Sequence, residues 1–358
     1  MCPTPSDLRG DQAPIRRPSA RGFARPLFAA ALERRKALIA KKATQAFRAF
    51  SGTPDGVDGV FIDVYGPGAV LIVYEGSTPK GFDPAIEAVN ALDELAPLGV
   101  RAVYFKPFAK DRSKLGGELP AVVTDKNPAA GEPLTDAVVI RELDWNLEIR
   151  LYDGLSTGLF LDQRENRGFV ARWVADRIRA GGPVPSVLNT FAYTCAFSIA
   201  AAKAGAATTS VDVSPRYLDW GKRNFAHNAM QPEVDSGKHR FARMDTFEYL
   251  AYAKRKALKH DLIILDPPSF ATGSRKKGIK PWSSTEDYAR LVREAATVLG
   301  PKGVIFASTN THDLCKPGRL DSEITRGLGR PPRWIKLPEP PTDFATEHDR
   351  FAARAFGV

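Results

Sequence analysis

The residues best suited to chemistry directly follow the apolar run at 262–265, and they are Asp266, Pro267, Pro268 and Phe270. The run predicts a buried parallel strand that ends at Asp266, because prolines cannot remain in a sheet ladder. Open α/β sheets bind ligands at the carboxyl ends of their strands. We therefore expect Asp266 and nearby carbonyls, held rigidly by the prolines, to accept hydrogen bonds there. Phe270 would stack on a flat base that carries an amino group. The alternative is a plain Pro-Pro turn with Phe270 in the core.

Two further acids end predicted strands in the same half of the chain. Asp212 lies 23 residues beyond Asn189, where the preceding strand ends. This separation is close to that at which dinucleotide-binding folds place an acid on a ribose diol. Asp245 could accept a hydrogen bond from an adenine amino group. Each acid alone could be an ordinary strand-end cap, but three acids at one sheet edge indicate a nucleoside site.

The turn after the first of these strands, residues 189–197, contains no glycine. A pyrophosphate requires close backbone approach, so the missing G-x-G-x-x-G argues against a nicotinamide dinucleotide and against an oxidoreductase. A nucleoside without phosphate fits better. S-adenosylmethionine has a ribose, an adenine and an amino-acid tail, and Asn189 and Thr194 could bind that tail.

The elements that must position these residues alternate between strands and helices from residue 158 onward. Strands are expected at 184–189, 208–213, 239–243, 262–266 and 303–308, and helices at 158–180, 195–205, 214–228, 245–257 and 284–299. We expect Asp162 and Ser214 to cap their helices. This succession predicts an α/β fold, with a largely parallel sheet covered by helices on both faces.

The part of the chain before residue 154 has a different pattern. Residues 1–27 are rich in proline and arginine and predict an arm that is disordered when free, either a solvated tail or a phosphate contact. The composition of this arm also resembles that of a transit peptide, although Asp7 and Asp11 weaken that interpretation. Residues 28–153 predict a small α+β domain that docks substrate or packs on the catalytic domain at 154–358. Its elements would be a basic amphipathic helix over 27–50, a hairpin over 56–74, a helix over 83–96, a strand at 102–105 and two strands within 137–152.

The composition indicates a globular protein with an anionic partner. The 358 residues are 43% hydrophobic and 26% charged, and their formal net charge of +10 favours nucleic acid. Cys2, Cys195 and Cys315 lie far apart without a CxxC pair, so we expect neither a disulfide framework nor a metal site, and a cytoplasmic location. No stretch is long and apolar enough to predict a membrane span or a secretory signal.

Five motifs, taken in order, resemble a known family: F-L-D-Q-R-E-N-R, L-N-T-F-A-Y-T, S-V-D-V-S, M-D-T-F and L-D-P-P-S-F. They look like the class I S-adenosylmethionine-dependent methyltransferases that modify bacterial large-subunit (23S) ribosomal RNA, of the methyltransferase I/K type. The resemblance implies a Rossmann-like sheet, S-adenosylmethionine as cofactor, and RNA as substrate. It also implies that residues 266–270 face the methyl group and the base. By position, the residues around the cofactor would be Gln163, Asn189, Phe191, Tyr193, Thr194, Asp212 and Asp245.

Three departures from the family pattern bear on function. We expect no counterpart of the N-terminal RNA-binding PUA domain that many members have, and Cys195 and Ala196 stand where glycines are usual. Members that methylate carbon 5 of cytosine have Ser-Cys-Ser where this chain has Ser308-Thr309-Asn310, and that carbon needs a thiolate to add to the ring first. Cys315 lies next to Lys316, which could lower its pKa, but it looks more like an ordinary cysteine near a helix start. The sequence therefore favours a guanine nitrogen, which already carries a usable lone pair.

The preferred hypothesis is an enzyme that methylates a base of large-subunit ribosomal RNA. A basic loop at 271–280 beside Phe270 suits an RNA backbone, although a solvated loop is equally consistent. The alternatives are an RNA-binding or assembly factor that has lost turnover, and a methyltransferase for proteins or small molecules. The sequence leaves open the nucleotide, the choice between naked RNA and a precursor particle, and homodimer formation.

Overall fold

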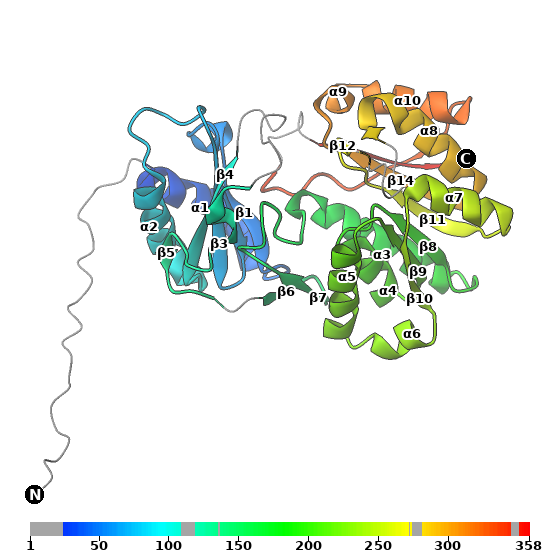
Figure 1. Cartoon of the computed structure of the whole chain (residues 1–358), viewed down its shortest axis with the longest axis horizontal. Helices are drawn as coiled ribbons and strands as arrows, with labels where there is room; N and C mark the ends of the chain where they lie inside the picture. The colour runs from blue at the N-terminus through cyan, green and yellow to red at the C-terminus, as the bar shows by residue number, and fades with distance from the viewer. Residues whose placement is uncertain (1–23, 109–118, 135–136, 272, 274–280, 345–350) are drawn as a thin grey trace, which may run out of the picture.

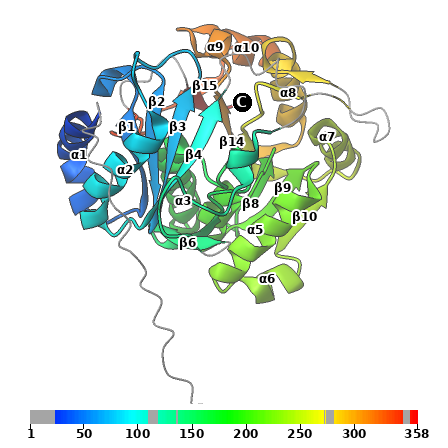
Figure 2. The ribbon, with the colours of Figure 1, turned by 60° about the vertical axis from the view of Figure 1, so that its left-hand side comes forward.

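The computed structural model describes residues 24–358 except 109–118, 135–136, 272, 274–280 and 345–350. Two adjoining units are visible, the first from blue to cyan and the second from green to red (Figure 1). The first unit is a five-stranded sheet in the order β1-β2-β3-β4-β5, with two helices packed on one face (Figure 2). Its elements are α1 (Arg25–Ala40), β1 (Ala46–Ser51), β2 (Val60–Tyr65), β3 (Gly68–Tyr74), α2 (Pro84–Leu95), β4 (Ala102–Phe108) and β5 (Ala130–Gly131).

The helix predicted over residues 27–50 is wrong in its second half. α1 ends at Ala40, Lys42 has a positive φ of 50°, and residues 46–51 form β1 against β2. The apolar residues of β1 are buried on both sides of the sheet, so their spacing fits a buried strand as well as a helix. α1 also begins at Arg25, so residues 25–27 belong to this helix and not to the expected arm, whose residues 1–23 lie outside the described part.

The other helices and strands expected in the first unit are confirmed. β2 and β3 form the predicted hairpin, with Gly66 at a φ of 58° in its turn, where a side chain would be strained. α2 is capped by Asp83, whose Oδ1 accepts a hydrogen bond from the amide of Ala85. The two strands expected within 137–152 are β6 (Val138–Glu142) and β7 (Trp145–Ile149), which pair as a separate hairpin.

The second unit is a seven-stranded sheet in the order β10-β9-β8-β11-β14-β16-β15. Its first five strands are parallel, and β16 runs antiparallel to both neighbours. α3, α4 and α5 cover one face, and α7, α8 and α10 cover the other. The strands are β8 (Ser186–Thr190), β9 (Ala207–Asp212), β10 (His239–Arg243), β11 (His260–Leu265), β14 (Leu299–Thr309), β15 (Arg333–Ile335) and β16 (Ala352–Gly357). The helices are α3 (Arg164–Arg179), α4 (Ala196–Lys203), α5 (Pro215–His227), α6 (Gln231–Asp235), α7 (Thr246–Arg255), α8 (Ser284–Thr297), α9 (His312–Cys315) and α10 (Arg319–Leu328), and a short ladder joins β12 (Phe270–Ala271) to β13 (Trp282–Ser283).

The doubly wound α/β architecture is the one that the alternation of elements predicted. β11 lies at the centre, its residues 262–265 are fully buried, and it ends directly before Asp266. Ser214 caps α5 as expected, by accepting from the amide of Tyr217. Asp162 does not cap α3, because Gln163 is the residue that precedes the helix. The elements after residue 309, including the antiparallel strand β16, were not predicted.

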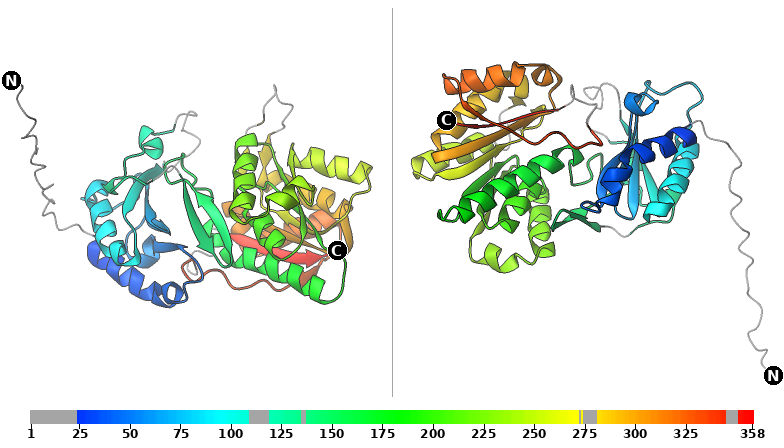
Figure 3. Two further views of the ribbon diagram at one scale, coloured as in Figure 1. Left: turned by 90° about the horizontal axis from the view of Figure 1, so that it is seen from below. Right: turned by 180° about the vertical axis from the view of Figure 1, so that it is seen from behind.

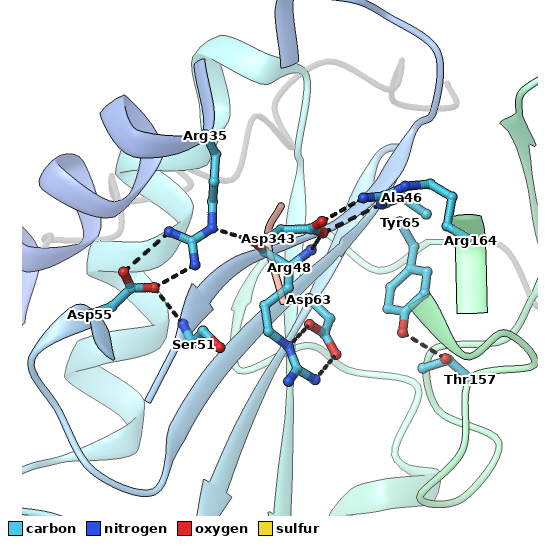
Figure 4. Close-up of polar contacts among 10 residues, drawn as sticks. All are labelled: Arg35, Ala46, Arg48, Ser51, Asp55, Asp63, Tyr65, Thr157, Arg164 and Asp343. Carbon is cyan, nitrogen blue, oxygen red and sulfur yellow. Dashed lines mark hydrogen bonds and ion pairs between the residues drawn. The ribbon is translucent and has the colours of Figure 1, made fainter. Parts of the chain in front are cut away.

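The two units share a continuous core. The β6–β7 hairpin lies between them (Figure 1), and Arg167 of α3 makes a buried bidentate ion pair with Glu142. The segment after β15, dark red in Figure 3, returns from the second unit to the first. There Asp343 accepts from the Arg48 amide and pairs with Arg164 (Figure 4). The residues around any site at this junction are therefore held by both units.

No helix among the described residues has the length and apolar character needed to span a membrane.

Candidate active site

The three predicted acids meet in one cavity at the carboxyl ends of the parallel strands. Asp212 ends β9, Asp245 follows β10, and Asp266 follows β11. All three line a cavity of about 370 Å³, which we call the carboxylate cavity. Of the other residues expected around a cofactor, Gln163, Phe191 and Tyr193 also line it.

Asp212 is held in place by backbone amides. Its Oδ2 accepts from the amide of Tyr193 at 2.9 Å, and its Oδ1 accepts from the amide of Ser214 at 2.8 Å. Burial raises the pKa of Asp212, and these amide hydrogen bonds oppose that shift. Each carboxylate oxygen keeps a further lone pair for a ligand hydroxyl.

Asp245 is both a helix cap and part of the cavity wall. Its Oδ1 accepts from the amides of Phe247 and Glu248 at 2.8 and 3.3 Å and so begins α7. The ordinary interpretation, a strand-end cap, is therefore correct for this oxygen. The two interpretations are compatible, because the same carboxylate also lines the carboxylate cavity.

Asp266 belongs to a side-chain network at the end of β11. Its Oδ1 accepts from Ser308 Oγ at 2.6 Å and from Gln163 Nε2 at 3.2 Å, and Gln163 also donates to Ser308 at 3.1 Å. Gln163 Oε1 accepts from Asn166, so the amide of Gln163 is engaged at both ends. Burial raises the pKa of Asp266, and the hydrogen bond from Ser308 opposes the shift. Gln163 thus positions Asp266 from within the wall.

The turn after β8 achieves its tight path without glycine. Phe191, Tyr193 and Cys195 alternate along it with positive φ values of 52°, 50° and 66°. Phe191 and Tyr193 line the carboxylate cavity. Asn189 and Thr194 do not line it, because Asn189 donates to Ser198 at 2.9 Å and Thr194 donates to the carbonyl of Gly158 at 2.6 Å. Their side chains stabilise the turn from behind.

The residues after Asp266 reach the rim of the cavity. Pro267 and Pro268 line it, and the carbonyl of Pro268 already accepts from Trp282 Nε1 at 2.7 Å and from Ser284 Oγ at 2.8 Å. Phe270 is 61% exposed, which excludes the alternative that it packs in the core. Of the predicted basic loop, residues 272 and 274–280 lie outside the described part.

A second cavity adjoins the first at the boundary of the two units. This junction cavity has a volume of about 520 Å³ and is lined by β-sheet residues of the first unit, including Phe61, Tyr65 and Tyr74, and by Phe270 of the second. The two cavities share several wall residues, which are Ser156, Phe160, Asp162, Tyr193, Pro268, Asn310 and Phe351. A ligand in one cavity is therefore adjacent to a ligand in the other.

Comparison with known proteins identifies the family. Residues 124–345 match the model of the S-adenosylmethionine-dependent methyltransferases. The chain belongs to this family. The relative YwbD from Bacillus subtilis is 38% identical to this chain over 78% of the chain. The ribosomal RNA large subunit methyltransferase K/L of Psychrobacter cryohalolentis is 34% identical to this chain over 74% of the chain. The alignments span 65% and 31% of those two proteins, respectively.

A solved structure extends the likeness to both units. The crystal structure of SMU.776 complexed with SAH matches 94% of this chain and 81% of its own, with a TM-score of 0.76 and 29% identity. The class I resemblance and the Rossmann-like fold expected from the sequence are thereby confirmed, and S-adenosylmethionine is the cofactor of the family. The agreement covers the first unit as well as the second.

The two cysteines in the described part of this methyltransferase chain are not cavity residues. Cys195 and Cys315 are buried and line neither cavity, and Cys315 Sγ donates to the carbonyl of Thr309. Burial raises the pKa of the Cys195 thiol to about 12, so it is not a thiolate near neutral pH. Cys195 has the left-handed conformation that explains why glycine is usual at this position.

Several wall residues of the carboxylate cavity were not predicted. Tyr217 packs against Tyr193 with ring centroids 4.5 Å apart, and Trp282 packs against Phe191 at 5.7 Å, so two aromatic pairs flank the acids. Asp162 was assigned to helix capping, yet it lines both cavities. Asp162 lies in the F-L-D-Q-R motif, but its place in the short helical turn Leu161–Gln163 could not be predicted from the sequence.

Proposed function

We propose that the protein transfers the methyl group of S-adenosylmethionine to a base of large-subunit ribosomal RNA. The observation that carries the proposal is the meeting of Asp212, Asp245 and Asp266 in one cavity that adjoins a second, aromatic cavity. Asp212 would accept hydrogen bonds from the ribose hydroxyls and Asp245 from the adenine amino group. The sulfonium methyl would then lie near Asp266, facing the junction cavity.

RNA as the substrate class is supported by charge, by exposed rings and by relatives. The chain carries a formal net charge of +10, and Phe160 and Phe270 are 49% and 61% exposed beside the cavities. The Psychrobacter relative is named for ribosomal RNA of the large subunit. The first unit, which begins with α1 at Arg25, would dock the RNA against this opening.

A guanine nitrogen is the atom we favour as methyl acceptor. Cytosine carbon 5 requires a thiolate that adds to the ring, and no described cysteine lines either cavity. Ser308 lies where a catalytic cysteine sequence would begin, and it is engaged with Asp266. A nitrogen with a lone pair needs only alignment in line with the sulfonium and exclusion of water. Two adjoining walled cavities can provide both.

The proposal is tested by incubating the purified protein and tritium-labelled S-adenosylmethionine with large-subunit rRNA from a strain that lacks the gene. Label in RNA that nuclease digestion assigns to a methylguanosine is the expected result. RNA binding without label would indicate a binding or assembly factor, and label found only in protein or small molecules would indicate another substrate class.

Cofactor binding is tested separately at Asp212. Asp212→Ala should weaken the Kd for S-adenosylhomocysteine at least tenfold by calorimetry, because two charge-assisted hydrogen bonds to the ribose are lost. Asp219→Ala, on the exposed side of α5, is the control and should leave the Kd unchanged. Asp266→Ala should slow transfer more than it weakens binding. Equal affinity of wild type and Asp212→Ala would contradict the ribose assignment.

A further inference from the structure

The strongest unassigned feature is the junction cavity together with the carboxylate at its inner end. Phe61, Tyr65 and Tyr74 project from the sheet of the first unit, and Phe160 and Phe270 face them from the second. A volume of about 520 Å³ between aromatic walls suits a flat ring that has left its stack.

Asp162 lies where the two cavities meet. It lines both, and its Oδ1 is buried without a hydrogen-bond partner among the described residues. Asp266 differs, because its Oδ1 is engaged by Ser308 and Gln163. A buried carboxylate oxygen without a partner is costly, so its persistence at a cavity wall points to a ligand group that satisfies it.

We propose that the junction cavity takes the nucleobase to be methylated, and that the ionised Asp162 carboxylate faces the attacking nitrogen and compensates the positive charge that moves onto the base. This inference rests on the proposed function. In the transfer, a bond forms between the nitrogen and the methyl carbon, the bond from that carbon to sulfur breaks, and its electron pair stays on sulfur. If the nitrogen carries a hydrogen, that proton passes to Asp162 and then to water. If it carries none, the carboxylate remains as the counter-charge.

Charged groups of both signs act on Asp162. Asp266 and Asp63 act on it as negative groups, and Arg48 and Arg167 act as positive ones. Arg48 is held over the Phe61 ring and makes a bidentate pair with Asp63, at 2.8 and 3.1 Å (Figure 4). Burial, followed by the charge of Asp266, raises the pKa of Asp162 to about 6. The carboxylate is therefore mostly ionised at neutral pH but becomes protonated in mild acid.

Single-turnover transfer to unmodified large-subunit rRNA tests the role of Asp162. Asp162→Asn should reduce the rate about 100-fold and leave the Kd for S-adenosylhomocysteine within threefold of wild type. The wild-type rate should fall as the pH drops below about 6, and the Asp162→Asn variant should lose this dependence. A structural role alone would not remove it.

The base pocket is tested with two matched substitutions in one sheet. Phe61→Leu changes the wall of the junction cavity and should raise the KM for RNA about tenfold. Phe47→Leu changes the core on the helix-covered face of the same sheet and should not raise the KM for RNA.

If wild type methylates RNA while Asp162→Asn keeps the wild-type rate and pH profile, the inference is refuted and the proposed function stands. If wild type methylates no RNA, both fail. An unchanged KM for Phe61→Leu would refute the assignment of the pocket.

Discussion

Asp162→Asn should make the protein more stable at neutral pH while it impairs transfer. The pKa of this carboxyl is raised from its ordinary value of 3.8 to about 6 in the folded protein. Between these two values the folded state binds a proton that the unfolded state has released, so stability falls as the pH rises through this window. Each pH unit corresponds to about 1.4 kcal/mol, and the full cost of the ionised Asp162 above pH 6 is therefore about 3 kcal/mol. Asparagine carries no charge and avoids that cost.

Urea denaturation at pH 7.5 and at pH 4 measures the difference. The variant should exceed wild type by up to about 3 kcal/mol at pH 7.5, and the gap should close at pH 4, where wild-type Asp162 is protonated in the folded state. Asp176→Asn in α3, the helix that follows Asp162, is the control, because Asp176 is exposed and should change stability by less than about 0.5 kcal/mol at either pH. A variant that is less stable than wild type at pH 7.5 would refute the reasoning.

Two further substitutions test the packing that supports the site. Arg167→Met should lower the free energy of unfolding by about 3–5 kcal/mol in urea, since it leaves the buried Glu142 carboxylate unpaired; a loss below about 1 kcal/mol would contradict this. Gly158→Ala should cost about 3 kcal/mol, because Gly158 has a φ of 104° and an added Cβ would lie 2.3 Å from the Trp220 ring. Gly237→Ala, with a φ of 79° and open space around it, should cost only about 1 kcal/mol, and equal losses would exclude the Trp220 contact as the cause.

The parts of the fold that the sequence predicted depend on local pattern. β11 could be placed because an apolar run is followed by two prolines, and α5 because Ser214 precedes a periodic helix. β1 was misassigned because a strand buried on both faces lacks the alternation that distinguishes it from a helix. The antiparallel insertion of β16 between β14 and β15 is a tertiary pairing that no local signal encodes.

The candidate site could also be predicted only in part. Asp212, Asp245 and Asp266 could be brought together in advance because the carboxyl ends of parallel strands share one sheet edge. The direction of individual side chains could not be predicted. Asn189 turns to Ser198, and Asp162 lines both cavities without capping α3, because backbone angles in the adjoining turns decide where each side chain lies.

The most direct measurement is a crystal structure of the protein with S-adenosylhomocysteine. Our account predicts the ribose hydroxyls within hydrogen-bond distance of Asp212, the adenine beside Asp245, and the sulfur turned to the junction of the two cavities near Asp162 and Asp266. A nucleoside bound elsewhere, or bound with its sulfur facing away from that junction, would contradict it.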